Sequence, residues 1–335
     1  MDRVSLKLKI DHPIDEIVGA LESRVPDLIS ARSVPGVSIS ILRGNKCVWA
    51  GGFGVRSTET KDPVTADTVF EAYSCTKPLV AYAALKMCEE GMLDLDRPLG
   101  EYLGKPYIEG DSRINKITLR MALSHTSGLM DDEKRAIAFE PGTRWSYSTG
   151  GFYYVQKVLE TVYDSSFEKT MSECLLIPLQ MDASGFTSEQ RFRSVMAQGH
   201  WTDGKPDADR QIPEGDADSL FTTPADYAKF LSPIMSDYQI GQQMNEPFVR
   251  VSDKLSWGLG WGIQHTDAGD CFWHFGGGPA PFNNLAIGFK DRGLGVVITT
   301  NGENGRSIFE DLVELTIGGD YPVFPWADFL ASHFE

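Results

Sequence analysis

Strand-like segments stand at both ends of this chain, and a long helical stretch separates them. Near the N-terminus, residues 37–42 and 46–52 have β-strand character, and Arg43-Gly44-Asn45 between them predicts a tight hairpin turn. Toward the C-terminus, strands are expected at 258–264, 271–275, 284–290 and 294–300, the last two joined at Asp291-Arg292-Gly293. The two ends can join one antiparallel sheet only if the middle of the chain is an insertion.

Amphipathic helices are expected on this sheet. Residues 13–29 place apolar side chains near a 3.6-residue period, and 307–317 has the pattern of a closing helix. Further helices are expected at 74–90, 119–124, 152–162 and 224–235. We therefore predict an α/β (α+β) fold, in which an antiparallel sheet is flanked by N- and C-terminal helices and carries a large helical insertion lobe. The predicted division is a discontinuous sheet domain, 1–70 plus 246–335, and a mainly helical lobe, 71–245, with the active site between the lobes.

Overall charge narrows the possible partners. The chain has 335 residues, a net charge of −16 and a pI near 4.8, which disfavours binding to nucleic acid or to an anionic membrane surface. The six histidines form no metal-ligand pair, and no phosphate-binding glycine motif is present, so neither a metal nor another cofactor is expected. A small-molecule substrate is the expected partner.

The cysteines and the N-terminal segment bear on the cellular compartment. Five cysteines are scattered along the chain, an odd number that favours reduced thiols. No apolar run approaches membrane-spanning length, and residues 1–10 lack the apolar core of a signal peptide. The sequence as given thus predicts a cytoplasmic protein.

Ser74-Cys75-Thr76-Lys77 carries the first chemical signal. Residues three apart share a helical face, so the Ser74 hydroxyl and the Lys77 amine are expected to meet. A partly desolvated lysine can lose its proton near neutral pH and activate a serine nucleophile. The tetrad alone also arises by chance, and a serine that caps a helix together with a solvated lysine would look the same.

Two further motifs follow in order: Tyr147-Ser148-Thr149 and His274-Phe275-Gly276-Gly277. With the tetrad, they resemble the S-x-x-K, Y-x-N and [KH]-[TS]-G motifs of the penicillin-recognising serine hydrolases. The chain is thus similar to the serine β-lactamase-like family, the group of class C β-lactamases, DD-peptidases and family VIII esterases. Framing segments around residues 34–38, 123–129, 221–227 and 257–261 extend the resemblance over most of 14–302.

The resemblance implies a role for each motif residue. Ser74 would be the nucleophile, Lys77 the acylation base or the partner that holds Tyr147 as phenolate, and Tyr147 the proton relay. His274 would occupy the third-motif position, and the backbone N–H groups of Ser74 and Gly277 would form the oxyanion hole.

Substrate contacts are expected at three further positions. The Gly276-Gly277 pair would let an edge strand approach the acyl group closely. Thr149 departs from the usual asparagine, and Phe275 replaces the usual threonine or serine. Both replacements remove polar contacts to groups of a β-lactam substrate. A dyad formed by Ser124 and His125 is disfavoured because adjacent residues do not face each other.

The leading functional hypothesis is a serine hydrolase, most consistent with a carboxylesterase on small esters that acts through an acyl-serine intermediate. The alternative is a β-lactamase or a D-amino-acid-specific peptidase or amidase similar to penicillin-binding proteins. From another class, the fold could serve as a catalytically inactive binding module, against which the retained serine, lysine and tyrosine argue.

Overall fold

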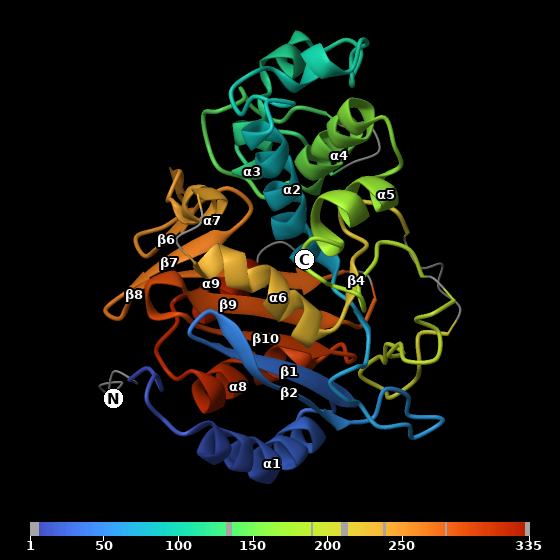
Figure 1. The fold of residues 1–335 in the computed structure, drawn as a ribbon, viewed down its shortest axis with the longest axis vertical. Helices are drawn as coiled ribbons and strands as arrows, with labels where there is room; N and C mark the ends of the chain where they lie inside the picture. Colours follow the sequence, from blue (N-terminus) through green and yellow to red (C-terminus); the bar gives the residue numbers. More distant parts are fainter. Residues whose placement is uncertain are drawn as a thin grey trace.

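The computed structural model describes residues 7–131, 136–188, 190–208, 214–236, 239–278 and 280–331. Its centre is an eight-stranded antiparallel sheet in the order β2-β1-β10-β9-β8-β7-β6-β5 (Figure 1). The strands are β1 (Gly36–Arg43), β2 (Lys46–Gly54), β5 (Val249–Arg250), β6 (Leu255–Trp257), β7 (Gly262–Thr266), β8 (Gly269–Gly277), β9 (Asn283–Phe289) and β10 (Leu294–Thr300). A separate two-stranded sheet pairs β3 (Phe70–Glu71) with β4 (Phe221–Thr222).

The N-terminal hairpin joins the C-terminal strands within the same sheet, as the sequence predicts. β1 pairs with β10 from Val37 opposite Thr300 to Arg43 opposite Leu294. Gly44 and Asn45 form the two-residue hairpin turn with φ of 54° and 63°. Two positive φ values in succession favour glycine and asparagine, so this dipeptide sets the strand register.

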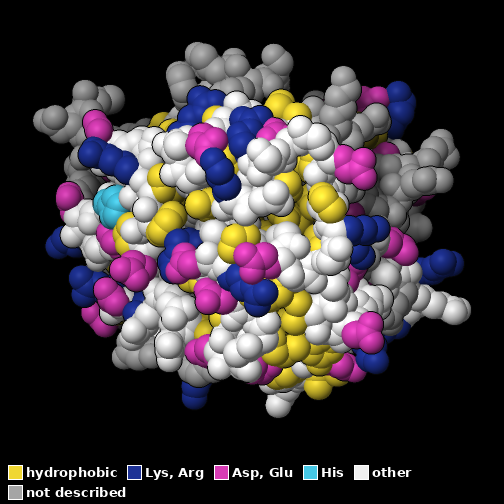
Figure 2. Space-filling model, turned by 90° about the horizontal axis from the view of Figure 1, so that it is seen from above, with side chains coloured by type: hydrophobic (Ala, Val, Ile, Leu, Met, Phe, Trp, Pro, Cys, Tyr) yellow, Lys and Arg dark blue, Asp and Glu magenta, His cyan; other side chains and the backbone are white. Residues whose placement is uncertain are grey.

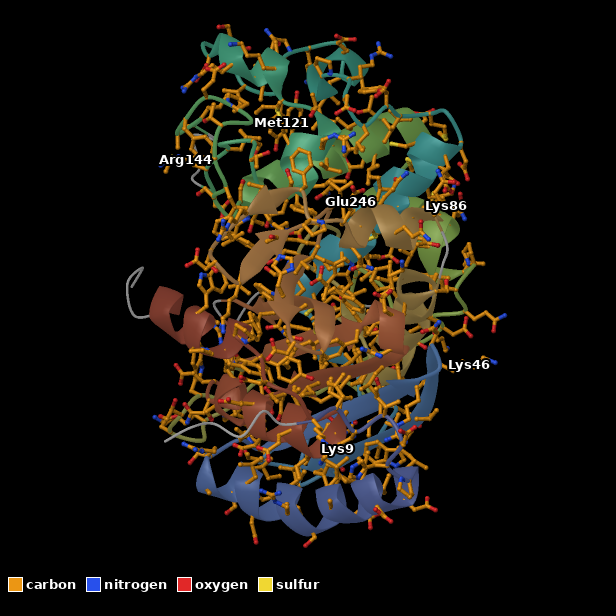
Figure 3. The ribbon with its side chains drawn as sticks, turned by 90° about the vertical axis from the view of Figure 1, so that its left-hand side faces the viewer. Lys9, Lys46, Lys86, Met121, Arg144 and Glu246 are labelled. Carbon is orange, nitrogen blue, oxygen red and sulfur yellow. The ribbon has the colours of Figure 1, made fainter. Side chains whose placement is uncertain are left out.

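Each face of the sheet has its own helices and core. α1 (Ile14–Ala31) and α8 (Phe309–Thr316) pack together on one face, and α6 (Pro224–Met235) covers β1, β2 and β10 on the other (Figure 1). Figure 3 shows α1 at the opposite end of the molecule from the helical lobe, with Lys9 between α1 and the sheet. The Lys9 Nζ donates to the carbonyl of Leu315, 2.9 Å away, and so fastens the N-terminal segment to α8.

The helical lobe stands above the sheet in Figure 1. Ten of the thirteen residues of α2 are buried, as expected of a helix that is apolar on all sides and forms the centre of a lobe. Its hydrophobic core is continuous with the α6 face of the sheet, where Phe272 and Val297 belong to the same cluster. Val323 and Phe324 of α9 (Val323–Ala331) join the core on the α1–α8 face of the sheet. The remaining helices are α2 (Lys77–Glu89), α3 (Leu119–Leu123), α4 (Thr149–Tyr163), α5 (Phe167–Met171) and α7 (Gln239–Asn245).

Several segments differ from the sequence-based expectation, and the short strands β5 and β6 are additional to it. The helix expected from residue 74 begins with a 3₁₀ turn, Tyr73–Thr76, and becomes α-helical at Lys77. The strand expected over 258–264 begins only at Gly262 because residues 258–261 turn the chain between β6 and β7, with Gly260 at a φ of +88°. Helix α9 was not expected. The predicted division of the chain into two lobes stays a prediction.

Among the described residues, no helix is long and apolar enough to cross a membrane. All five cysteines are free thiols, and only Cys47 is exposed. Acidic and basic side chains intermingle with apolar ones over the face seen from above, on the side of the helical lobe (Figure 2).

Candidate active site

Backbone conformation positions Ser74 in the 3₁₀ turn that directly precedes α2. The preceding residue, Tyr73, has a φ of +48°, which is rare for a non-glycine residue and occurs preferentially at functional sites. The Tyr73 hydroxyl donates to Glu71 Oε2 at 3.1 Å. A Cβ at Gly278 would lie 2.3 Å from the Tyr73 ring, so the segment that directly follows β8 packs on Tyr73. These contacts hold the strained turn that presents Ser74.

Three side chains meet at the nucleophile. The Lys77 Nζ lies 2.9 Å from Ser74 Oγ, and the Ser74 hydroxyl lies 3.0 Å from Asp218 Oδ1. The same oxygen of Asp218 accepts from Lys77 Nζ at 2.6 Å. The structure thus brings Ser74 and Lys77 together at the predicted spacing and adds a carboxylate that the sequence analysis missed.

The charge state of Lys77 follows from this arrangement. Lys77 is completely buried, which by itself lowers the pKa of its amine, but interactions with Tyr147 and Asp218 outweigh burial and raise the pKa above its ordinary value. Burial also raises the pKa of Tyr147, so this side chain is a neutral phenol near neutral pH. Asp218 is therefore the negative charge that keeps Lys77 an ammonium.

Tyr147 reaches the nucleophile from the segment before α4. Figure 3 shows Arg144, three residues earlier, at the outer edge of the helical lobe. The Tyr147 ring centroid lies 5.5 Å from the Lys77 Nζ, and interactions with Lys77 and Ser74 partly offset the rise in the pKa of the Tyr147 phenol, while 38% of the residue stays exposed to the cleft. Its ring stacks on His125 with 4.2 Å between centroids. His125 accepts the Ser148 N–H at Nδ1, 3.0 Å away, so it supports Tyr147 rather than pairing with Ser124.

β8 forms the opposite wall of the site. His274 is buried, and its Nδ1 lies 2.6 Å from the carbonyl oxygen of Phe275. Burial and the nearby Lys77 lower the pKa of His274 to about 3, so the imidazole is neutral at neutral pH. Gly276 is required by close packing, because a Cβ there would lie 2.0 Å from the Ala72 carbonyl oxygen. Gly277, the next residue, lines the cleft.

A cleft of about 730 Å³ opens from Ser74 along this wall. Its lining is largely aromatic and comes from distant parts of the chain: Trp145, Tyr147, Trp257, Trp273, Phe275, Phe309 and Trp326. The Arg306 guanidinium lies 4.5 Å from the Phe275 ring centroid within the same lining. Such walls favour apolar and aromatic substrate groups next to the nucleophile.

Not every predicted contact residue faces this cleft. Phe275 lines it, whereas Thr149 is the half-buried first residue of α4 and is not among the residues of the cleft wall. No trio of His, Cys, Asp or Glu in the described segments is placed to hold a metal ion. Of the features that sequence reasoning missed, Asp218 had the clearest signal, because its acidic loop directly precedes the framing segment at 221–227.

Comparisons with known proteins show which family the chain belongs to. The chain is 24% identical to a beta-lactamase of Pseudomonas fluorescens over 271 residues, which cover 73% of this chain and 74% of the relative. Protein flp of Staphylococcus aureus is 25% identical over 174 residues, which cover 46% of this chain and 35% of that longer protein. The octameric penicillin-binding protein homologue from Pyrococcus abyssi superposes with a TM-score of 0.75 at 25% identity, covering 86% of this chain and 74% of that one.

A D-alanine carboxypeptidase AmpC from Burkholderia cenocepacia shares the fold at a TM-score of 0.77 and 21% identity, with 89% of this chain and 100% of that one covered. The family model described as Beta-lactamase matches residues 18–315, nearly the whole chain. The chain therefore belongs to the Beta-lactamase family, a superfamily of serine hydrolases.

Proposed function

We propose that this protein is a carboxylesterase that hydrolyses small uncharged esters through an acyl-Ser74 intermediate. One observation carries the proposal: the hydrogen-bonded Ser74 and Lys77 pair opens onto an aromatic cleft in which Phe275 stands at the hydroxyl position of the third motif. Ser74 and Lys77 are arranged as a site of acylation would require. At Phe275, the third motif lacks the hydroxyl that would hold a substrate carboxylate.

In the proposed reaction, Ser74 Oγ attacks the ester carbonyl while the backbone N–H groups of Ser74 and Gly277 stabilise the oxyanion. The alcohol then leaves with a proton from the Tyr147 hydroxyl, a role supported by the position of Tyr147 beside Lys77 and Ser74 in the cleft. The aromatic wall holds the apolar group of the ester. Water next attacks the acyl-enzyme and releases the acid.

The second candidate is a β-lactamase or D-peptidase, favoured by the relatives that carry those names. Two features weigh against it. Thr149 lacks the paired donor and acceptor of an asparagine amide, and it lies away from the cleft wall. In addition, Phe275 stands in the cleft wall in place of the hydroxyl residue of the third motif, which removes a contact to a substrate carboxylate.

The test compares kcat/KM for p-nitrophenyl butyrate, a chromogenic cephalosporin and a D-alanyl peptide. We expect the ester to be the best substrate, and we expect a fluorophosphonate probe to label the peptide that contains Ser74. A Ser74→Ala variant is the matched control, and it should lose both activities. If the cephalosporin or the peptide is the best substrate, the esterase proposal is wrong.

A further inference from the structure

We propose that Asp218 is a catalytic residue that accepts the hydroxyl proton of Ser74 during acylation, while Lys77 remains an ammonium throughout. This inference rests on the proposed acyl-Ser74 hydrolase and assigns its base. The sequence motifs provide for a nucleophile, a lysine and a tyrosine, but none of them includes a carboxylate.

The distances among Asp218, Ser74 and Lys77 support Asp218 as the base. Asp218 Oδ1 is 3.0 Å from Ser74 Oγ, within the range of a direct proton transfer. The Lys77 Nζ lies 2.9 Å from the same hydroxyl and 2.6 Å from the same carboxylate oxygen. Lys77 is therefore placed as a donor to both oxygens, and the lone pairs of Asp218 are the acceptor for the serine proton.

The loop that carries Asp218 is held by an internal hydrogen bond and by bonds to two other elements. The Asp218 N–H donates to Asp216 Oδ1 at 2.8 Å, and the Ala217 N–H donates to Gln156 Oε1 of α4 at 3.0 Å. On its other side, the Leu220 N–H donates to Thr76 Oγ1, 3.1 Å away in the turn that holds Ser74. Asp218 is thus attached to the nucleophile's own turn and to α4, so its position relative to Ser74 is rigid.

The other groups near Ser74 are protonated or uninvolved at neutral pH. Lys77 and Tyr147 both have raised pKa values and carry their protons. His125 and His274 are neutral because burial lowers the pKa of each ring, but no hydrogen bond joins either one to Ser74 among the described residues. The titratable side chains that face Asp218 from the surrounding elements are Glu71, Cys75, Lys77, Tyr147, Tyr153 and Asp216.

The proposed acylation step conserves both protons and electron pairs. The Ser74 O–H bond breaks and its proton moves to Asp218 Oδ1, while Oγ forms a bond to the ester carbon and the carbonyl π electrons become the oxyanion. When this intermediate collapses, the carbon–oxygen bond to the alcohol breaks and the alkoxide takes a proton from the Tyr147 hydroxyl. In one concerted shift, Lys77 passes a proton to the Tyr147 phenolate and receives the proton held by Asp218, so Lys77 stays an ammonium.

The activity of the Asp218→Asn variant distinguishes this mechanism from one in which Lys77 is the base. Asparagine keeps an oxygen acceptor for Lys77 and Ser74 but cannot take a proton. If Asp218 is the base, kcat/KM for p-nitrophenyl butyrate at pH 7 should fall at least about a hundredfold. If Lys77 is the base, removing the carboxylate lowers the pKa of Lys77 and enlarges its neutral fraction, so the rate at pH 7 should hold or rise.

The experiment measures pH profiles of kcat/KM for the wild type, Asp218→Asn and a control, Asp96→Asn, which removes the carboxylate of a surface ion pair with Arg120. A loss of less than a hundredfold in Asp218→Asn, or a gain, overturns the proposal. If that variant does not fold by circular dichroism, Asp218→Ala is assayed with and without formate. Restoration of the rate by formate supports the proposal, and its absence overturns it. An inactive wild type or an active Ser74→Ala variant instead refutes the proposed function itself.

Discussion

Gly276→Ala tests whether close packing of β8 against the nucleophile's turn sets the geometry of the site. The added Cβ would lie 2.0 Å from the Ala72 carbonyl oxygen and 3.0 Å from the Cys75 Sγ. Unbonded heavy atoms prefer roughly 3.5 Å or more, so β8 and the turn must separate by more than about 1 Å. Gly277, the proposed oxyanion donor, is the next residue on the same strand and must move with it. Misplacement by about 1 Å can cost about a hundredfold in rate, and overpacking costs about 1–3 kcal/mol in stability.

The assay is kcat/KM for p-nitrophenyl butyrate together with the free energy of unfolding in urea. Gly277→Ala is the matched control, because its Cβ would meet Asn283 Oδ1 at 3.5 Å and the Phe282 carbonyl oxygen at 3.6 Å, which are ordinary contacts, and its N–H is kept. We expect Gly276→Ala to lose about a hundredfold in kcat/KM and the control to lose far less. Equal losses in the two variants would refute the reasoning.

Two further predictions concern Tyr147 and His274. Tyr147→Phe removes the hydroxyl proposed as the proton relay but keeps the ring stacked on His125, so kcat should fall at least about a hundredfold with an unchanged circular dichroism spectrum; full turnover would contradict the relay role. For His274, the pKa is lowered to about 3 in the folded protein from 6.5 in the unfolded chain, so the unfolded state binds more protons below pH 6.5. The stability from the neutral ring is complete above pH 6.5 and is lost as the pH falls toward 3, by about 2 kcal/mol at pH 5. Urea unfolding at pH 8 and pH 5 should show this loss in the wild type and a smaller one in His274→Gln; identical losses in both proteins would disprove it.

Local patterns in the sequence predict much of the fold. The Gly44-Asn45 turn sets the register of the first hairpin because two positive φ values are needed there. The helix over 224–235 is predicted at its observed bounds, and its start is marked by Thr223, which caps the Asp226 N–H, and by Pro224 in the first turn. These signals work because turn, cap and helix preferences depend on neighbouring residues.

Part of the candidate site is equally local. Ser74 and Lys77 meet because residues three apart share a helical face, and the glycine at 276 marks a strand that approaches another backbone closely. Tyr147 and His274 were placed by family resemblance rather than by any local rule. Their positions in the structure, around Ser74 and Lys77, are consistent with that resemblance.

Only the tertiary structure revealed Asp218 and the aromatic wall of the cleft. Asp218 is 144 residues from Ser74, and Trp326 comes from α9 near the C-terminal end of the chain. No periodicity links such distant positions, because their meeting depends on how the lobes and helices pack and not on local backbone preference. The sequence by itself determined the sheet, its hairpin and the serine–lysine pair, whereas packing decided which charge and which aromatic rings surround that pair.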